Sequence, residues 1–262
     1  MLDATTYETI SFDRHDDGVV VATLQRPEKL NAVDGRMHHE LSRLPRDADD
    51  DPGLRVLVLT GAGRAFCAGG DFSPDAVPLG SFGTPLVEEG RRIVDGILDC
   101  AKPVIAAVNG YAMGLGATIA LLCDVVVAGR SAVFADTHVN LGIGAGDGGQ
   151  LIWPMLVGPN KAKYFLMTGD RVDATEAERI GLVNFVVDDD QTLARALEIA
   201  TRLATGPAQA IRASKQAVNA WMRTVSATVL PLSLALEEAC FGSDDQREAV
   251  AAFNEKRPPR FR

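Results

Sequence analysis

The chain has 262 residues, of which 47% are apolar, 23% charged and 6% aromatic, as is typical of a globular protein with a sizeable core. Its 26 Lys and Arg residues against 35 Asp and Glu residues give a net charge of −9. This acidic surplus argues against a nucleic-acid-binding protein and against a protein that docks on anionic membranes.

Three features together predict a cytoplasmic location. Residues 1–13 lack the basic stretch followed by an apolar core that marks a secretory signal. The longest apolar stretch, 112–129, contains Asp124 and several small residues, which favours a buried core segment over a membrane span. None of the four cysteines belongs to a Cys-x-x-Cys pair, and all lie among apolar residues. We therefore expect reduced core thiols.

The first part of the chain alternates between strand and helix patterns. Residues 8–12 and 19–24 predict a hairpin around a His-Asp-Asp-Gly turn. A helix over 34–44 is expected to end at Pro45. Further strands are predicted over 56–60, 104–108 and 125–128, and a further helix over 86–101. This alternation predicts an α/β fold.

Beyond about residue 158 the patterns become mostly helical. A capping sequence begins at Asp173, Gly181 ends the helix that follows, and 182–187 is expected to be the last strand. Helices are predicted over 191–204, 207–222, 226–241 and 244–255. We therefore expect an α/β core over residues 1–195 and a helical region over 196–262.

Two glycine-rich segments, 61–71 and 110–117, each follow a predicted strand and lead toward a predicted helix. Such loops present free backbone N–H groups and a favourable helix dipole, and glycine permits close approach. Two converging loops could polarise one carbonyl oxygen, as an oxyanion hole does. From the residues alone, each segment is either a carbonyl cradle or a structural turn.

Short motifs follow one another along most of the chain. They include Arg26-Pro27-Glu28-Lys29-Leu30-Asn31-Ala32, Ala65-Phe66-Cys67-Ala68-Gly69-Gly70-Asp71, Lys102-Pro103, Asn109-Gly110-Tyr111-Ala112, Cys123-Asp124, Phe134-Ala135, 177–183 and 253–261. Together they resemble the crotonase (enoyl-CoA hydratase/isomerase) superfamily over residues 8–261. The resemblance implies a spiral of ββα units, a C-terminal helical trimerisation region, and a homotrimer or a dimer of trimers. It also implies an acyl-CoA thioester substrate, with coenzyme A as part of the substrate and no separate cofactor.

The resemblance also implies where the substrate binds. By motif position, the thioester oxygen is held by the backbone N–H groups of Ala68 and Leu115, which would stabilise an enolate or a tetrahedral oxyanion. The other implied contacts are Leu30 and Ala32 near the adenine, and Asp71 and Phe72 along the pantetheine.

The chain departs from the hydratase pattern at both catalytic glutamates. Their positions are held here by Thr118 and His138. A threonine hydroxyl is too weak an acid to replace a glutamate, although it could bond a water or a substrate oxygen, whereas histidine is a competent base near neutral pH. Asp147 stands where hydratases carry a small residue. At this position the chain resembles the dienoyl-CoA isomerases and chlorobenzoyl-CoA dehalogenases, in which an aspartate acts as base or nucleophile.

Two interpretations of His138 and Asp147 stay open. Asp147 could orient His138 and raise its basicity, so that the pair deprotonates water or a substrate α-carbon. Alternatively, Asp147 caps the helix that begins near Gly148, and His138 is a buried hydrogen-bonded side chain. Because both residues occupy catalytic positions of the resembled family, we favour the catalytic interpretation.

The same residues also resemble the crotonase-fold β-diketone hydrolases, such as 6-oxocamphor hydrolase, where a His–Asp pair activates water for carbon–carbon cleavage. Glu238 falls near an acidic site residue of those hydrolases, and Trp153 could form a wall of the acyl pocket. Three functions are therefore weighed: an acyl-CoA enzyme of the hydratase/isomerase type, a CoA-independent β-diketone hydrolase, and a non-catalytic acyl-CoA-binding protein.

Two further expectations concern charged residues. His15, His38 and His39 lack the spacing of metal ligands, so we expect surface histidines and no metal site. The tail is locally basic despite the acidic chain, and we expect it to meet the phosphates of coenzyme A. Its basic residues are Lys256, Arg257, Arg260 and Arg262.

Overall fold

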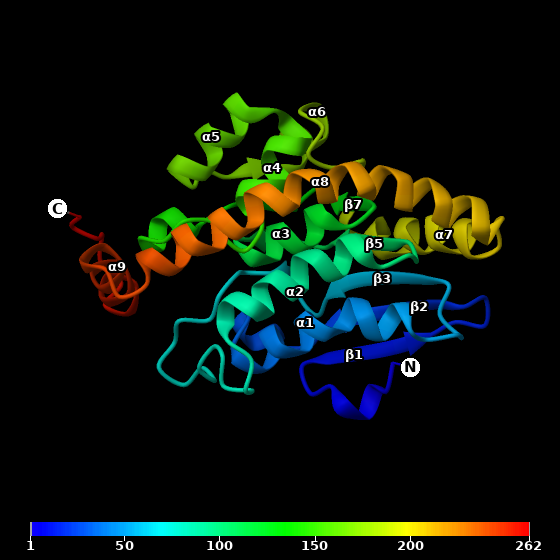
Figure 1. The fold of residues 1–262 in the computed structure, drawn as a ribbon, viewed down its shortest axis with the longest axis horizontal. Coiled ribbons are helices and arrows are strands. Elements are labelled where there is room, and N and C mark those ends of the chain that lie inside the picture. The colour runs from blue at the N-terminus through cyan, green and yellow to red at the C-terminus, as the bar shows by residue number, and fades with distance from the viewer. Residues whose placement is uncertain (1, 262) are drawn as a thin grey trace.

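The computed structural model describes residues 2–261, which form two sheets and nine α-helices (Figure 1). The larger sheet contains β1 (Ile10–Arg14), β2 (Val19–Leu24), β3 (Val56–Gly61), β5 (Val104–Val108), β7 (Val125–Gly129) and β10 (Phe185–Val187), in that order. The smaller sheet contains β4 (Ala65–Cys67), β6 (Tyr111–Met113), β8 (Val133–Ala135) and β9 (Val172–Asp173). The helices are α1 (Gly35–Asp49), α2 (Leu86–Asp99), α3 (Leu115–Leu122), α4 (Gly149–Val157), α5 (Pro159–Thr168), α6 (Ala174–Arg179), α7 (Thr192–Ala204), α8 (Ala208–Cys240) and α9 (Asp244–Asn254). The α/β prediction is confirmed.

The larger sheet is parallel except at its first strand pair. The predicted hairpin is confirmed, because β1 runs antiparallel to β2 while the remaining neighbours pair in parallel. Both faces of the central strands are covered, which explains why they are continuous apolar runs. Val58 and Ile105 face the alanines of α7, whereas Leu57 and Ala106 belong to the core formed with α1, α2 and α3.

Three successive units follow the same order: a strand of the larger sheet, a strand of the smaller sheet, and a helix. They are β3-β4-α2, β5-β6-α3 and β7-β8-α4. The expected spiral of ββα units is thus confirmed. Strands β4 and β6 lie inside the two glycine-rich segments and pair in parallel, with Ala65 opposite Tyr111 and Cys67 opposite Ala112. This pairing brings the ends of both segments together.

Two helix predictions differ from the structure. Pro45 lies inside α1, which continues to Asp49. The last turn is held by a neighbouring buried residue, because Lys102 Nζ donates to the carbonyl of Ala48 at 2.9 Å and the Ala101 amide donates to Asp49. The expected helices over 207–222 and 226–241 are one 33-residue helix, α8, with a proline inside it.

The expected boundary after residue 195 falls inside α7, which covers one face of the larger sheet. The helical region outside the spiral therefore begins with α8, which lies across α2 and α4 (Figure 1). The role of this region in assembly stays a prediction. Within residues 2–261 no single helix is long and apolar enough to cross a membrane; α8 and α9 meet that test only jointly, with a 70° bend between them.

All four cysteines are free, and three of them are buried as expected. Burial raises the pKa of the Cys67 thiol to about 12, so this residue near the pocket is a packed thiol rather than a thiolate. Cys240, near the end of α8, is only partly buried, so the prediction of a core thiol is wrong there.

Candidate active site

A pocket of about 660 Å³, part of it open to solvent, lies between α1, α2, α8 and the ends of the two glycine-rich segments. Its walls are mostly apolar, and Gly70, Leu115, His138 and Asp147 also line it. Apolar side chains in the walls include Val33, Phe72, Leu86, Val87, Ile143 and Leu234. An enclosed apolar cavity with a few convergent polar groups is the usual form of a small-molecule site.

The two glycine-rich segments approach so closely that a side chain would not fit between them. A Cβ added at Gly69, whose φ is +89°, would lie 3.0 Å from the Met113 carbonyl oxygen. On the other side, a Cβ at Gly114 (φ +52°) would contact the His138 ring at 3.4 Å. The glycines thus bring both segments and His138 to one place.

Each segment offers one free backbone N–H group to the pocket. The Leu115 amide lies at the first position of α3, where a helix has no internal acceptor, and it has no other acceptor within residues 2–261. The predicted donor Ala68 is occupied, because its N–H donates to the Leu30 carbonyl at 3.0 Å. The Gly70 amide has no acceptor among the described residues.

The prediction of Ala68 as the donor is therefore wrong by two residues. The segment around Gly70 pairs as an extended strand with the segment around Val33. The Val33 amide donates to the Gly69 carbonyl at 2.7 Å, and the Asp71 amide donates to the Val33 carbonyl at 2.9 Å. Alternate amides of a strand point to opposite sides, so this pairing leaves the Gly70 N–H on the pocket side.

Arg26 fixes this segment from behind. Its guanidinium contacts Asp71 at 2.9 Å and Asp34 at 3.3 Å, and it also donates to the Ala32 carbonyl. Burial raises the pKa of Asp71, but hydrogen bonds from Ser73 and Arg26 outweigh it and lower the pKa below its ordinary value. Asp71 is thus an anchor of the loop and does not line the pocket.

The other predicted substrate contacts divide into three groups. Phe72 lines the pocket as expected. Leu30 and Ala32 are half-buried outside its lining, and their contact with an adenine stays a prediction. Trp153 is fully buried in the core against Phe165, so the prediction that it forms a pocket wall is wrong.

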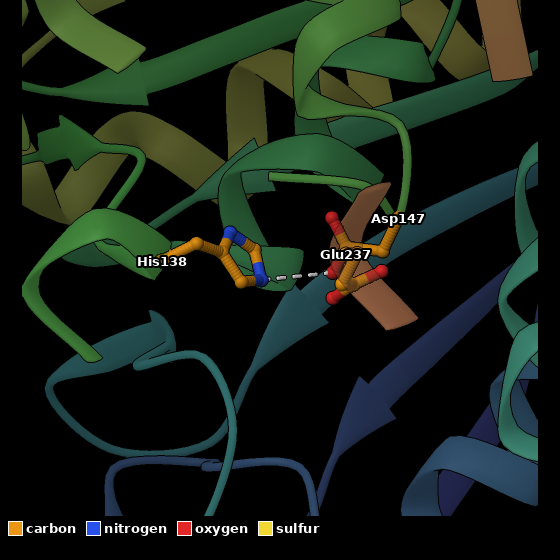
Figure 2. A group of neighbouring side chains, drawn as sticks. All are labelled: His138, Asp147 and Glu237. Atoms are coloured by element: carbon orange, nitrogen blue, oxygen red, sulfur yellow. Dashed lines mark ion pairs between the residues drawn. The ribbon is translucent and has the colours of Figure 1, made fainter. Parts of the chain in front are cut away.

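Four nearly buried side chains meet at the polar end of the pocket, and we call Asp136, His138, Asp147 and Glu237 the acidic cluster. His138 Nδ1 lies 2.6 Å from Asp136, and Nε2 lies 3.2 Å from Asp147. Figure 2 shows the His138 ring facing Asp147 and Glu237. Asp147 makes no capping bond to α4, whose N-cap is Gly148, so the helix-cap interpretation is wrong.

The surroundings set the protonation of this cluster. Burial lowers the pKa of His138, but the carboxylates of Asp147 and Asp136 overcome it and raise the pKa well above 6.5. Burial and the charge of Asp147 raise the pKa of Glu237 to about 8, against the opposing charge of His138. At neutral pH His138 is therefore an imidazolium and Glu237 a neutral acid.

Two members of the cluster differ from the predicted residues. Glu237 occupies the position expected for Glu238, which is exposed. On α8 the buried positions Leu230, Ser233 and Glu237 share one face, and the next residue is rotated by about 100° away from it. Asp136 was not predicted, although its position two residues before His138, at the end of β8, was a signal.

Thr118 is completely buried and lies outside the pocket lining. Its methyl group would lie 2.8 Å from a Cβ at Gly148, so it sits behind the loop that carries Asp147. Its hydroxyl oxygen has no hydrogen-bond partner within residues 2–261. Its expected hydrogen bond to a water or a substrate oxygen stays a prediction.

His138, Asp147 and Glu237 each offer one ligand atom, and these atoms lie within 4.8 Å of one another, close enough to share a cation. A histidine ligand must offer a lone pair, whereas in the protonated His138 ring both nitrogens carry a hydrogen, and each lies beside a carboxylate. The cluster thus fits proton transfer better than metal binding.

The basic tail is partly neutralised. Arg257 makes a bidentate pair with Glu248, at 2.5 and 3.0 Å, and contacts Glu255 at 2.6 Å. Its charge is thus already matched within the chain. Arg260 lies beside it at a surface hollow near α9, and Arg262 lies outside the described residues. The expected contact of this tail with phosphates stays a prediction.

Comparisons with known proteins agree with this geometry. The family model "Enoyl-CoA hydratase/isomerase" matches residues 14–262. The chain is 39% identical to a probable enoyl-CoA hydratase of Rhodobacter capsulatus, over 98% of both chains. It is 36% identical to the 1,2-epoxyphenylacetyl-CoA isomerase of Escherichia coli, over 94% of this chain and 95% of that one. A crystal structure of an enoyl-CoA hydratase/isomerase from Mycobacterium paratuberculosis superposes with a TM-score of 0.87 at 37% identity, covering 94% and 98% of the two chains. The chain belongs to the enoyl-CoA hydratase/isomerase family.

Proposed function

We propose that this protein is an enzyme of the hydratase/isomerase type that acts on an acyl-CoA thioester. The observation that carries the proposal is the meeting, in one apolar pocket, of two free amides, those of Gly70 and Leu115, with the acidic cluster. A thioester oxygen held by both amides gains stabilisation as negative charge develops on it. The reacting carbon would then lie beside Asp147 and Glu237.

The two carboxyl groups divide the proton transfers between them. Asp147 faces the imidazolium of His138, and its Oδ1 has no partner within residues 2–261. It acts as the base toward water or an α-carbon. Glu237 holds a proton at neutral pH and returns one to the substrate. The different surroundings of the two carboxyl groups thus assign Asp147 as the base and Glu237 as the acid. In these roles they replace the two glutamates of the hydratases.

His138 takes a different role from the one expected. The sequence predicted a base that Asp147 orients. In the structure the second aspartate, Asp136, holds Nδ1, so the ring has a carboxylate at each nitrogen. We assign His138 as the group that orients Asp147 and stabilises negative charge near it.

A second candidate is hydrolysis of a β-diketone without coenzyme A. The observation that favours it is Glu237, because an acid beside a His–Asp pair is the set implied by the resemblance to 6-oxocamphor hydrolase. In that reaction Asp147 and His138 would activate the water that cleaves the carbon–carbon bond. The family relationship and the two amides favour the thioester.

One experiment separates these functions. The purified chain is assayed with crotonyl-CoA, a dienoyl-CoA and a cyclic β-diketone, and binding of the thioesters is measured by calorimetry to the wild type and to Asp147→Asn. We expect turnover of a thioester, and an Asp147→Asn variant that binds it but turns it over far more slowly. Turnover of the diketone alone would establish the second candidate. Thioester binding without turnover by the wild type would identify a non-catalytic acyl-CoA-binding protein.

We also propose a homotrimer, or a dimer of trimers, assembled through the helical region. Large apolar side chains stand exposed along α8 and α9 in the single chain, with Trp221 59%, Leu232 61% and Phe253 61% exposed. Exposed apolar surface of this kind is typical of an interface. Light scattering on the eluting protein measures the mass of the assembly, and a monomeric mass would refute the proposal.

A further inference from the structure

A second histidine–carboxylate group lies beside the pocket, where α1 meets α2. We call His38, His39 and Glu89 the dihistidine cluster. The prediction of a surface residue is wrong for His38, which is 4% exposed and lines the pocket. Helix α1 turns His38 inward together with Met37 and Leu41, while His39 stays half-buried at the edge.

Glu89 is the centre of this cluster. It is completely buried on α2 and lies 2.8 Å from His38 Nδ1 and 2.9 Å from His39 Nδ1. Burial raises the pKa of Glu89, but the hydrogen bonds and charges of the two histidines outweigh it and lower the pKa below its ordinary value. Glu89 is thus an anion, which can only accept hydrogen bonds.

The hydrogen bond to the Glu89 carboxylate fixes the orientation and tautomer of His38. Because Glu89 accepts, Nδ1 of His38 must carry the hydrogen that it donates. The other ring nitrogen, Nε2, has no hydrogen-bond partner within residues 2–261. Most of the other residues that line the pocket are apolar, among them Val33, Leu86 and Val87.

An unpaired nitrogen in an apolar wall favours a substrate that supplies its partner. In the neutral ring Nε2 accepts from a hydroxyl group, and in the protonated ring it donates to a carbonyl or a carboxylate. A purely hydrocarbon acyl group would cover the nitrogen without replacing its hydrogen bond to water. Sites built to bond a polar substituent discriminate strongly against substrates that lack it.

We propose that His38 is a specificity-determining residue that binds an oxygen-bearing acyl group, in a substrate whose acyl chain carries a hydroxyl, carbonyl or carboxylate beyond the thioester. This rests on the proposed function, since it concerns the acyl part of the same thioester. Glu89 acts as the positioning residue, because it holds the His38 ring in the tautomer and orientation that present Nε2.

The test uses enoyl-CoA thioesters of equal chain length that end in a methyl, a hydroxyl or a carboxylate group. We expect the wild type to prefer an oxygenated thioester by at least about tenfold in kcat/KM. His38→Leu should lose that preference, while its kcat/KM for the methyl-ended thioester stays equal or rises. Which oxygenated thioester is preferred identifies the substituent.

The matched control is His39→Leu, which removes the other partner of Glu89 but alters no residue that lines the pocket. It should keep the preference. His38→Gln can still bond Glu89 through its amide, so it serves as a second variant if His38→Leu is poorly folded by circular dichroism, and it should show a reduced preference.

Two results would overturn the inference: a wild type that turns over the thioesters without preference, or a preference that survives in both His38 variants. If the wild type turns over none of the thioesters, the proposed function fails. Calorimetry with Asp147→Asn then tests the inference separately, because the ranking of affinities among the three thioesters does not depend on turnover. Equal affinities there would refute the role of His38.

Discussion

The two histidine–carboxylate clusters contain the same two kinds of group, imidazole and carboxyl, in opposite proportions. In the dihistidine cluster one carboxylate, Glu89, is shared by two imidazoles, and the pKa of Glu89 is lowered. In the acidic cluster one imidazole is shared by two aspartates with Glu237 close by, and the pKa values of His138 and Glu237 are both raised. Burial acts on both carboxyl groups, and the charged neighbours decide the outcome: two histidines lower the pKa of Glu89, whereas Asp147 adds to the rise that burial causes at Glu237.

This difference separates positioning from proton transfer. Glu89 stays ionised throughout the neutral range and ties α1 to α2 through its contacts with His38 and His39. Glu237 titrates near pH 8, so it can hold a proton and release it under working conditions. Two clusters at one pocket thus suit different tasks, and four measurements would break or sharpen the contrast.

The largest effect is expected from Asp147→Asn. The amide keeps the size of the side chain but cannot accept the proton, so kcat on the thioester should fall by about 10³-fold. Asp190→Asn, in an exposed turn, is the matched control and should leave kcat unchanged. A decrease of less than about threefold in Asp147→Asn would contradict its assignment as the base.

Glu89→Gln tests the other cluster, and there the effect should appear in stability. Removing the buried anion leaves two imidazole N–H groups with a weaker acceptor, at a cost of about 3 kcal/mol in the free energy of unfolding. Urea denaturation measures it. Glu88→Gln, the neighbouring partly exposed residue paired with Arg92, should change that free energy by less than about 0.5 kcal/mol. Equal changes in the unfolding free energy of Glu89→Gln and Glu88→Gln would contradict the structural role assigned to Glu89.

Glu237→Gln should lower kcat by about 10²-fold, because the amide is not an acid. In the wild type, kcat should also fall as the pH rises through about 8, where Glu237 loses its proton, and the variant should lack that limb. Glu238→Gln, the exposed neighbour, should retain both the rate and the pH profile. If Glu238→Gln had the larger effect, the assignment of the inward-facing residue would be incorrect.

The last measurement concerns stability against pH. The folded-state pKa of Glu237 is about 8, against 4.5 when unfolded, so between these values the folded protein binds the extra proton and stability falls as the pH rises. The slope from this group is at most about 1.4 kcal/mol per pH unit. His138, whose pKa is raised above 6.5, adds a loss of the same sign at higher pH. Urea titrations of Glu237→Gln between about pH 5 and 8 should show a flatter dependence; an unchanged slope would argue against a protonated Glu237.

Errors in the predicted site follow a common pattern. Motif position correctly selected Leu115, His138 and Asp147 for the pocket, but it missed Gly70 by two residues and Glu237 by one. Which side an amide or a side chain faces depends on the phase of strand pairing or on helix rotation. Neither can be read from a motif alone.

The sequence alone was sufficient for the α/β spiral, the hairpin and the family, because long apolar runs and ordered motifs are local properties of the chain. Only the tertiary structure decided that β4 and β6 are strands, that α1 continues through Pro45, and that His38 reaches the pocket. Each of these depends on a partner distant in sequence: strand pairing, the Lys102 ammonium, and Glu89. The protonation of His138 and Glu237 is likewise a tertiary property, since it arises from carboxylates that the fold buries side by side.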